Sequence, residues 1–496
     1  MNFYTSVEQA GNRLLVRGYE NGNRFNVRVP FNPTLFLPSK NYSEWKTLEG
    51  ECVEPHKFGS IQEAREFIKK YKEVPDFDIY GNSRFLYQYI AEQHSEFIKF
   101  DSSKIRVFNI DIETAAENGF PDIESADQEI LAISIKDSFS GRITVFGARP
   151  FDNKHADVDY MHFRSEESML GAFLDFWQSN YPDVVTGWNV QLFDMPYIHN
   201  RINRIMGEKF TKLLSPWKLV SQREIFIKGR KQFAVDTLGI SCLDYLELYK
   251  KFTYTNQESY RLDHICLVEL GERKLDHSEF DTFKEFYEND WQKFIDYNIH
   301  DVRLVDKLDD KMKLIELAYT MAYDAKVNYE DVFSQVRMWD NYIYNELNKR
   351  KIAIPPKKES AIKTEKYAGA YVKEPIPGFY DWVVSFDLNS LYPHLIMQYN
   401  ISPETLIDTR HPTASVDGLL NREVQISGDY CVCANRAQYR KDIQGFLPKM
   451  MQKIYDERVI FKKKMIQAKK EFEKTGNKKL QDDISAFNNI QMARKI

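Results

Sequence analysis

The spacing of apolar and polar residues predicts that the chain begins with β structure. Alternating runs at residues 13–19 and 24–29 flank the turn Glu20-Asn21-Gly22-Asn23, an arrangement typical of a β-hairpin. Residues 61–73 instead place apolar side chains every three to four residues, which predicts a helix.

Strand and helix patterns then follow one another in a way that predicts a mixed sheet covered by helices. Three apolar runs lie between residues 105 and 145. Helical spacing follows at about residues 165–180 and 194–207, and again at 290–325. A β-ribbon is predicted at residues 223–235, with the basic tip Lys228-Gly229-Arg230-Lys231.

The last third of the chain has a different pattern and follows a predicted domain boundary at Pro355-Pro356. Residues 383–387 form an apolar run that predicts a strand, and residues 448–464 have the spacing of a long helix. The fold class expected from these patterns is α/β and multidomain, and the length of 496 residues suggests about three domains.

The composition places the chain among globular proteins. Hydrophobic residues make up 43% of it, including 34 Phe and 29 Tyr, which is enough to bury large cores and excludes general disorder. No apolar run approaches the length of a membrane span, and we expect no signal peptide at the N-terminus. The five cysteines are scattered, so we expect reduced thiols; Cys431 and Cys433 have no second pair with which to bind a metal.

The charge is unevenly distributed. The net charge of −5 excludes a uniformly basic nucleic-acid coat. Residues 449–496, however, contain 13 basic and 6 acidic residues, a net charge of +7, so the preceding residues carry −12. A basic segment on an acidic body suggests a local anionic ligand.

Acidic residues form the first group with catalytic character. Asp111 and Glu113 alternate along a predicted strand, so both carboxylates point to one side, where two adjacent anions require a cation. Asp194 opens a predicted helix, and Tyr297 and Asp301 share a helix face at a spacing of four residues. Solvent-facing acids are the alternative for the strand pair taken alone, but the three pieces in this order favour a metal site.

These segments, D-I-E, N-x-x-x-F-D and Y-x-x-x-D, resemble the Exo I, II and III motifs of the DEDDy 3′–5′ exonucleases. The resemblance implies a ribonuclease H-like domain in which two Mg²⁺ ions, about 3.5–4 Å apart, hydrolyse a phosphodiester; Mn²⁺ is expected to substitute. It assigns the metal ligands to Asp111, Glu113, Asp194 and Asp301, and the orientation of the attacking water to Tyr297. Phe120 is expected to stack on a terminal base, with a core role equally open, and His300 is expected to be structural.

A second motif follows the predicted strand at 383–387. A single Asp at a strand end is usually a cap, but Asp387-Leu388-Asn389-Ser390-Leu391-Tyr392-Pro393 is similar to motif A of family B DNA polymerases. The resemblance implies that Asp387 and the Leu388 carbonyl hold catalytic Mg²⁺. It implies that the turn at Ser390 and Leu391 cradles nucleotide phosphates, and that Tyr392 excludes a 2′-hydroxyl.

Further segments fit the same family. Tyr367 and Gly369 lie in a stretch that looks like the family's Y-x-G-[GA] sequence, which runs along the template backbone. Arg458 and Lys462 share a helix face; a solvated basic face is the alternative, but their place after motif A suggests fingers that grip the triphosphate. Lys495 would be the triphosphate-binding lysine of motif B.

The order of these motifs resembles that of the family B DNA polymerases of T-even-type bacteriophages over nearly the whole chain. The resemblance implies the N-terminal part of a viral replicative DNA-directed DNA polymerase with a proofreading exonuclease, acting in the cytoplasm of an infected bacterial host. Its partners would be a DNA primer-template, dNTP and, through the complete polymerase, a sliding clamp and a single-strand binding protein. In related polymerases a hairpin such as the one tipped by Lys228, Arg230 and Lys231 holds template and primer apart; an ordinary surface hairpin is the alternative.

The sequence departs from the family after Lys495. The remainder of motif B, motif C with its second metal-binding Asp, and the thumb are absent, so we expect no DNA synthesis from this chain alone. We expect half of a split polymerase completed by a second polypeptide that carries motif C and the thumb. A shortened form of one longer chain is the alternative.

The resulting domain assignment has four parts. A β-rich N-terminal domain is expected at 1–104, rejoined by 327–358, and the exonuclease domain at 105–326. The first part of the palm is expected at 359–447, and part of the helical fingers at 448–496. Two rival functions remain: a stand-alone 3′–5′ exonuclease, and a non-catalytic regulatory subunit that binds nucleic acid such as RNA through the N-terminal domain.

Overall fold

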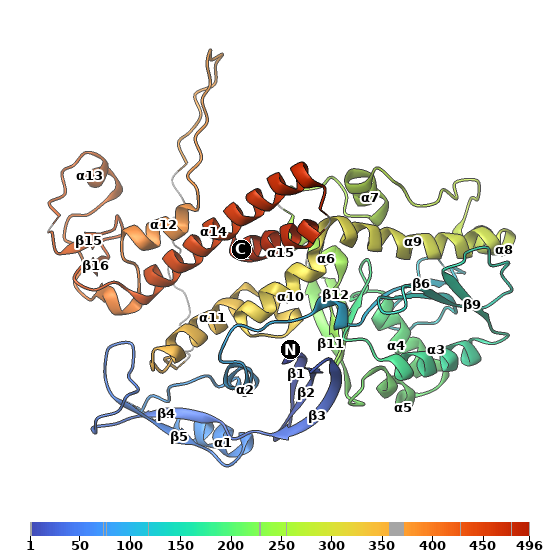
Figure 1. The fold of residues 1–496 in the computed structure, drawn as a ribbon, viewed down its shortest axis with the longest axis horizontal. Coiled ribbons are helices and arrows are strands. Elements are labelled where there is room, and N and C mark those ends of the chain that lie inside the picture. The colour runs from blue at the N-terminus through green and yellow to red at the C-terminus, as the bar shows by residue number, and fades with distance from the viewer. Residues whose placement is uncertain are drawn as a thin grey trace. The chain divides into compact units, whose positions relative to one another are not determined.

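The computed structural model describes residues 2–72, 74–75, 77–117, 119–227, 230–253, 255–356, 372–426, 428–477 and 479–495. The chain divides into two compact units (Figure 1). The first comprises Met1–Pro33, Phe58–Arg65 and Arg84–Asn345, and the second comprises Thr34–Lys57, Glu66–Ser83 and Glu346–Ile496. The limits of the units fall within two helices, α1 (Ile61–Tyr71) and α11 (Gln335–Lys349).

The first unit opens with the predicted β-hairpin, extended to a three-stranded antiparallel sheet. The strands are β1 (Asn2–Ala10), β2 (Arg13–Glu20) and β3 (Asn23–Pro30), and helix α2 (Phe85–Gln93) follows later in the chain. Asp183 comes directly before the first residue of a strand of the second sheet, and its side chain is fully buried. It accepts a hydrogen bond from Tyr19 at 2.9 Å and pairs with Arg24 at 2.6 Å. Because a buried carboxylate needs such partners, this network joins the first sheet to the second.

A six-stranded mixed sheet forms the centre of the first unit, in the order β13-β10-β6-β7-β8-β9. Strand β6 is antiparallel to β7 and parallel to β10. The strands are β6 (Val107–Thr114), β7 (Ile130–Asp137), β8 (Ile143–Gly147), β9 (Val158–His162), β10 (Val184–Thr186) and β13 (Ser241–Cys242). The predicted mixed sheet is therefore present.

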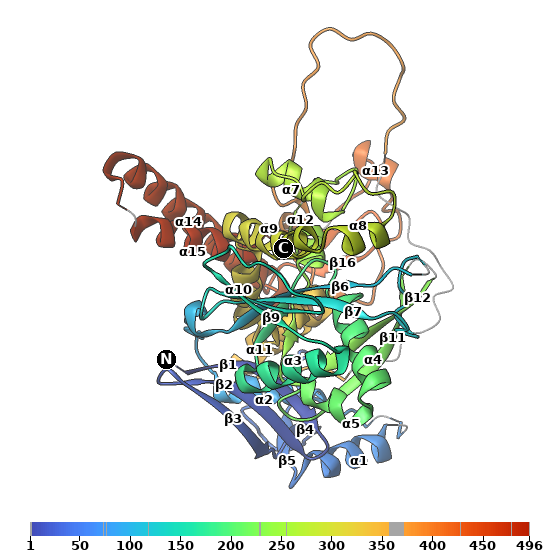
Figure 2. The ribbon, with the colours of Figure 1, turned by 90° about the vertical axis from the view of Figure 1, so that its right-hand side faces the viewer.

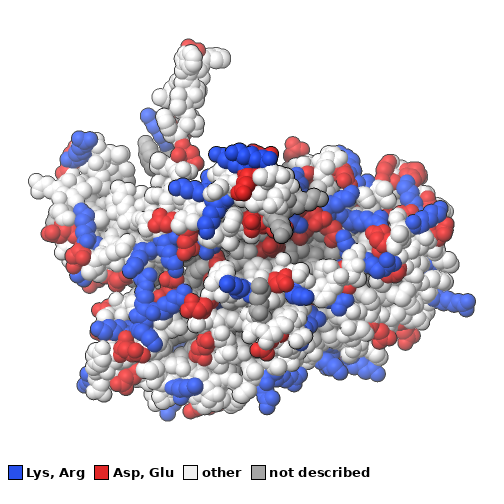
Figure 3. Space-filling view, viewed as in Figure 1, with Lys and Arg blue, Asp and Glu red and all other residues white. Residues whose placement is uncertain are grey.

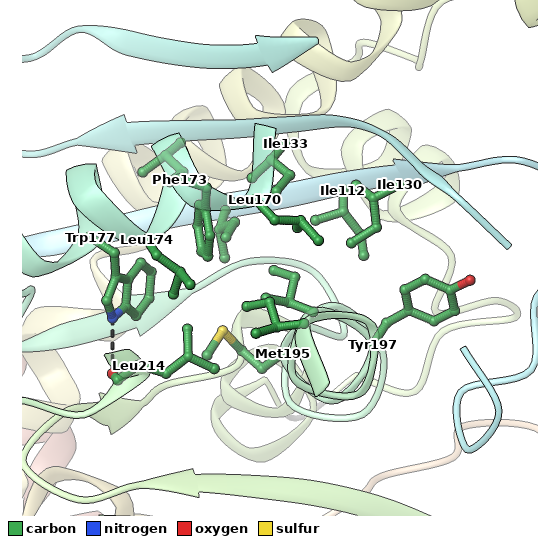
Figure 4. Packing of buried hydrophobic residues seen from close by; sticks show 14 of the residues in the cluster. Ile112, Ile130, Ile133, Leu170, Phe173, Leu174, Trp177, Met195, Tyr197 and Leu214 are labelled. Carbon is green, nitrogen blue, oxygen red and sulfur yellow. Dashed lines mark hydrogen bonds between the residues drawn. The ribbon is translucent and has the colours of Figure 1, made fainter. Parts of the chain in front are cut away.

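Two apolar cores cover this sheet. In the first, Ile112 and Ile133 pack with Phe173, Trp177 and residues of a second helix (Figure 4). In the second core, β7 and β8 pack against two later helices. The helices of the first core are α3 (Glu166–Asn180) and α4 (Asp194–Ile205), and those of the second are α8 (Phe283–Asn289) and α9 (Trp291–Met312). The sheet is thus fixed between helices that arrive from distant parts of the sequence.

The helical structure predicted for residues 290–325 is confirmed, and it is divided into two helices. Helix α9 ends at Met312, and α10 (Leu314–Ala325) begins after Lys313, whose φ of 54° is left-handed. A left-handed residue interrupts the hydrogen-bond ladder of a helix, while the apolar spacing continues on both sides.

Shorter elements complete the first unit. The predicted β-ribbon is present, because β11 and β12 pair in antiparallel fashion from Val220 with Thr237 to Ile227 with Arg230. The elements are η1 (Ser102–Lys104), α5 (Glu208–Thr211), η2 (Lys212–Leu214), β11 (Val220–Ile227), β12 (Arg230–Thr237), α6 (Tyr245–Phe252), α7 (Leu262–Leu270) and η3 (Tyr329–Phe333).

The second unit combines small sheets with a long helical pair. Helices α14 and α15 pack against each other (Figure 2). A short sheet has the order β14-β16-β15. The elements are β4 (Thr34–Pro38), β5 (Val53–Lys57), α12 (Leu391–Gln398), η4 (Pro403–Thr405), β14 (Leu406–Ile407), α13 (Val416–Leu420), β15 (Tyr430–Val432), β16 (Gln438–Arg440), α14 (Phe446–Thr475) and α15 (Lys479–Ala493). Among the described residues, no helix is both long and apolar enough to span a membrane.

The strand predicted at residues 383–387 is absent. Residues 372–388 contain no helix or strand and extend as a loop before α12 (Figure 2). Val383 and Phe386 are exposed, at 80% and 90% of their surface. A strand needs a neighbour that accepts its hydrogen bonds, and no strand in the described part of the chain pairs with this segment.

Candidate active site

Three carboxylates meet where β6 and α9 lie side by side in the first unit. Asp111 and Glu113 are two residues apart on β6, and Asp301 is on α9. One carboxylate oxygen from each lies within 4.8 Å of the other two, and no other such group is found among the described residues. The spacing of two along the strand aims the first two acids to one side, and α9 supplies the third.

The electrostatics of this group favour a bound cation. Burial, followed by the charges of Glu113 and Asp301, raises the pKa of Asp111 well above its ordinary value. Burial also raises the pKa of Glu113 to about 8, despite the opposing effect of Lys274. The Oδ1 atom of Asp301 is buried and accepts no hydrogen bond among the described residues. A divalent cation would compensate these charges and displace their protons, and carboxylate oxygens are the ligands that Mg²⁺ prefers.

Asp194 is tied to the same strand. It is the first residue of α4, it is 3% exposed, and its Oδ1 accepts a hydrogen bond from the backbone N–H of Ile112 at 3.0 Å. Burial raises its pKa to about 7, despite the hydrogen bonds from the backbone. The charge of Asp194 also raises the pKa of Asp111, so the structure brings all four predicted metal ligands into one electrostatic group.

Tyr297 lies beside these acids, and the structure adds a lysine that sequence reasoning missed. Tyr297 is 8% exposed and its pKa is raised by burial and by Asp301. The Nζ atom of Lys274 lies 2.5 Å from Asp301 Oδ2 and 4.5 Å from the centre of the Tyr297 ring. Burial lowers the pKa of Lys274, but Asp301 and its neighbours outweigh this effect and raise it. Lys274 lies in a loop between α7 and α8, where no periodicity or motif indicated a role.

The motif A residues lie in the second unit, before and at the start of α12. Asp387 and Leu388 are in the exposed loop, and Tyr392 is 74% exposed. Ser390 precedes the helix with a left-handed φ of 51°, and the Nη1 atom of Arg458 on α14 donates a hydrogen bond to its Oγ at 3.3 Å. The structure therefore brings two predicted triphosphate-binding residues together.

The other predicted residues of the polymerase site lie on or after the two long helices. Lys462 is one turn after Arg458 on α14, and Lys495 follows the end of α15, where its backbone N–H donates to the carbonyl of Met492 at 2.9 Å. Tyr367 and Gly369 lie outside the described residues. Cys431 and Cys433 form no disulfide in the described part of the chain.

Comparison with known proteins finds two matching segments. Residues 52–265 match the exonuclease domain of DNA polymerase family B, and residues 334–489 match DNA polymerase family B. The chain belongs to DNA polymerase family B. The predicted family and the predicted mixed α/β fold with exonuclease and partial polymerase domains are thereby confirmed.

Phage polymerases are among its relatives. The chain is 34% identical over 497 aligned positions to a protein named DNA-directed DNA polymerase from Escherichia phage RB69, covering 94% of this chain and 54% of that protein. It is 34% identical over 491 positions to the protein of the same name from Enterobacteria phage T4, covering 93% and 54%. A putative DNA polymerase of Frog virus 3 is 25% identical over 334 positions, covering 61% and 33%. The chain therefore spans about half the length of the phage polymerases it matches.

One predicted contact to the end of a DNA strand, Phe120, lies near the four acids. Phe120 is 83% exposed and its ring centre is 5.4 Å from that of Phe193, the residue before Asp194. An exposed ring supported by a second ring can stack on a base. The ring nitrogen Nε2 of His300 lies 3.0 Å from the carbonyl oxygen of Arg273, a structural contact.

The basic hairpin is a second predicted contact to DNA. Lys231 pairs with Glu224 at 2.8 Å and lies over the ring of Phe233, whereas Lys228 and the side chain of Arg230 lie outside the described residues. Figure 3 shows basic and acidic side chains interspersed over the visible face, with no uniformly basic coat.

Shortening this hairpin should separate two activities. We expect replacement of residues 228–231 by a two-residue turn to weaken removal of mispaired primer ends on duplex DNA and to spare hydrolysis of single strands. The reason is that a duplex end must be unpaired before it reaches the acids, whereas a single strand is already unpaired. Rates of digestion on the two substrates test this, and an equal loss on both would contradict it.

Proposed function

We propose that this chain is the N-terminal part of a replicative DNA polymerase and carries its 3′–5′ proofreading exonuclease. The observation that carries the proposal is the convergence of Asp111, Glu113 and Asp301 within 4.8 Å, with Asp194 hydrogen-bonded to the strand that bears the first two. Family B membership supports DNA as the substrate. The mixed sheet with helices on its faces is compatible with a ribonuclease H-like domain.

In this proposal the four acids hold two Mg²⁺ ions, and Mn²⁺ can substitute. Bound there, such ions would activate the attacking water and stabilise the leaving 3′ oxygen. The chain's own residues position the reactants: the Tyr297 hydroxyl orients the water, and Phe120 stacks on the terminal base. Lys274 holds Asp301 by its ion pair and adds one positive charge to a strongly acidic site that must accept a DNA phosphate.

The second unit supplies half of a polymerase site in this proposal. Asp387 and the Leu388 carbonyl hold Mg²⁺, the turn at Ser390 and Leu391 binds the triphosphate, and Tyr392 packs against the sugar. The hydrogen bond from Arg458 to Ser390 supports this assignment, because it places a cation at the turn. Lys462 and Lys495 contribute positive charge to the binding of the same triphosphate. Tyr367 and Gly369 contact the backbone of the template strand. Residues 359–447 and 448–496 would then be parts of the palm and fingers, beside an N-terminal domain at 1–104 and 327–358 and an exonuclease domain at 105–326.

Nucleotide transfer needs more than Asp387. Two-metal catalysis requires a second carboxylate donor, and a motif of that kind does not occur after Asp387 in this sequence. In this proposal it comes from a segment outside these 496 residues that carries motif C and the thumb. The assembled enzyme would use a DNA primer-template and dNTP in the cytoplasm of an infected bacterium, with a sliding clamp and single-strand binding protein as partners.

Digestion of end-labelled DNA tests the proposal. The purified chain should shorten a 5′-labelled single strand one nucleotide at a time with Mg²⁺, and EDTA should stop the reaction. A strand whose 3′ end is blocked by a non-hydrolysable linkage should resist. Binding of single strands without any Mg²⁺-dependent shortening would overturn the proposal in favour of a non-catalytic regulatory subunit.

A further inference from the structure

A buried asparagine contacts one of the proposed metal ligands. Asn298 follows Tyr297 on α9 and is fully buried. Its Nδ2 donates a hydrogen bond to Asp111 Oδ2 at 2.6 Å, and its Oδ1 accepts one from the hydroxyl of Ser134. Asn298 therefore links a carboxylate on β6 to a hydroxyl on β7.

The strand register explains why this link can form. Asp111 and Ser134 are directly paired across β6 and β7, so their side chains lie on the same face of the sheet. Helix α9 packs on both strands and brings Asn298 to this pair. Ser134 is also fully buried, so water does not compete with either hydrogen bond.

The chemistry of the two neighbours fixes the orientation of the amide. When Asp111 is ionised it only accepts hydrogen bonds, so the NH₂ group of Asn298 must face it. The Ser134 hydroxyl then donates to the remaining amide oxygen. The opposite orientation would place the amide oxygen against the carboxylate and leave that charge without a donor.

We propose that Asn298, held by Ser134, is a positioning residue that orients Asp111 for metal binding. The amide engages Oδ2 and restricts rotation of the carboxylate, while Asp111 Oδ1 has no hydrogen-bond partner among the described residues. Partners of metal ligands that act in this way typically change metal affinity or activity by about 10–100-fold when they are removed. This inference rests on the proposed metal-dependent exonuclease.

The chain offers a matched control in Asn109. This asparagine is also buried on β6, two residues before Asp111, and also links the strand to α9, because its Nδ2 donates to the Val302 carbonyl at 2.8 Å. It has no hydrogen bond to any of the four acids in the described part of the chain. Replacing it should disturb the packing of β6 against α9 without releasing Asp111.

The experiment measures Mn²⁺ binding to the full chain by electron paramagnetic resonance, with thermal unfolding in EDTA as a check on folding. We expect Asn298→Ala to weaken Mn²⁺ binding about 10–100-fold. Ser134→Ala should weaken it less, and Asn109→Ala should leave it unchanged. In Mg²⁺ titrations of hydrolysis, Asn298→Ala should raise the metal concentration needed for half-maximal rate more than it lowers the rate at saturation.

The outcomes separate this inference from the proposed function. If the unaltered chain bound no Mn²⁺, or bound it as well after Asp111 and Glu113 were replaced by alanine, the proposed function itself would fail. If the unaltered chain and Asn298→Ala bound Mn²⁺ equally, only the role of Asn298 would be overturned. Should Asn298→Ala fail to fold, Ser134→Ala carries the test, and binding equal to that of Asn109→Ala would overturn the inference.

Discussion

Replacing Asp111 and Glu113 together with alanine will lower hydrolysis of single-stranded DNA by several orders of magnitude. These acids supply two of the three carboxylates that lie within 4.8 Å of one another. Without them the remaining acids cannot hold two ions, so activation of the nucleophile and stabilisation of the leaving group are lost together. The measurement is the single-turnover rate of shortening of a 5′-labelled strand at saturating Mg²⁺.

An acid at the edge of the same sheet serves as the control for this loss. Asp159 is on β9 of the same sheet, it is exposed, and it pairs with Arg142 at 2.5 Å. Because an exposed ion pair contributes little to stability, Asp159→Ala should retain a rate close to that of the unaltered chain. If the double variant retained that rate as well, the site would be assigned to the wrong residues.

Changing Asp387 to alanine will abolish primer extension once the chain is completed by a segment that supplies motif C and the thumb. Asp387 is the only motif A carboxylate, and two-metal transfer fails when one of its donors is missing. Extension of a labelled primer, measured with each component alone and then mixed, reports this loss. Hydrolysis of single strands should persist in the same variant, because its acids belong to the first unit.

Asp381 is the matched control for Asp387. It lies six residues earlier in the same exposed segment, so its replacement by alanine removes a similar charge from the same loop. Extension should continue with Asp381→Ala. Primer extension by the 496-residue chain alone, free of host polymerase, would contradict the requirement for a further carboxylate.

The grouping of the candidate acids within each element could be predicted from the sequence because it depends on local rules. Alternation along β6 places Asp111 and Glu113 on one side, and the i, i+4 spacing places Tyr297 and Asp301 on one face of α9. What brings these elements together is the packing of α9 on the sheet, which the family resemblance implied and the spacing alone could not show.

Lys274 and Asn298 could not be predicted in this way. Lys274 lies in a loop, and its role depends on an ion pair with Asp301. The two residues are far apart in the sequence, so no periodic spacing connects them. Asn298 is a polar residue among mostly apolar buried residues of α9, and it becomes informative only when Asp111 and Ser134 are seen opposite it. Buried polar residues on helices are the signal that could have drawn attention to it.

The differences between prediction and structure have physical causes as well. The spacing of apolar residues carries no information on the backbone conformation of Lys313, whose left-handed φ separates α9 from α10. The run at 383–387 has the composition of a strand, but a strand forms only where a partner accepts its hydrogen bonds. The predicted domain limits and the roles assigned to single residues stay predictions.

The most direct test of the account is a crystal structure of the chain soaked in Mn²⁺, with anomalous diffraction used to locate the ions. We expect anomalous peaks between Asp111, Glu113 and Asp301, and the loss of these peaks when the first two are replaced by alanine. Mn²⁺ bound elsewhere, with this carboxylate group left empty at saturating metal, would contradict it.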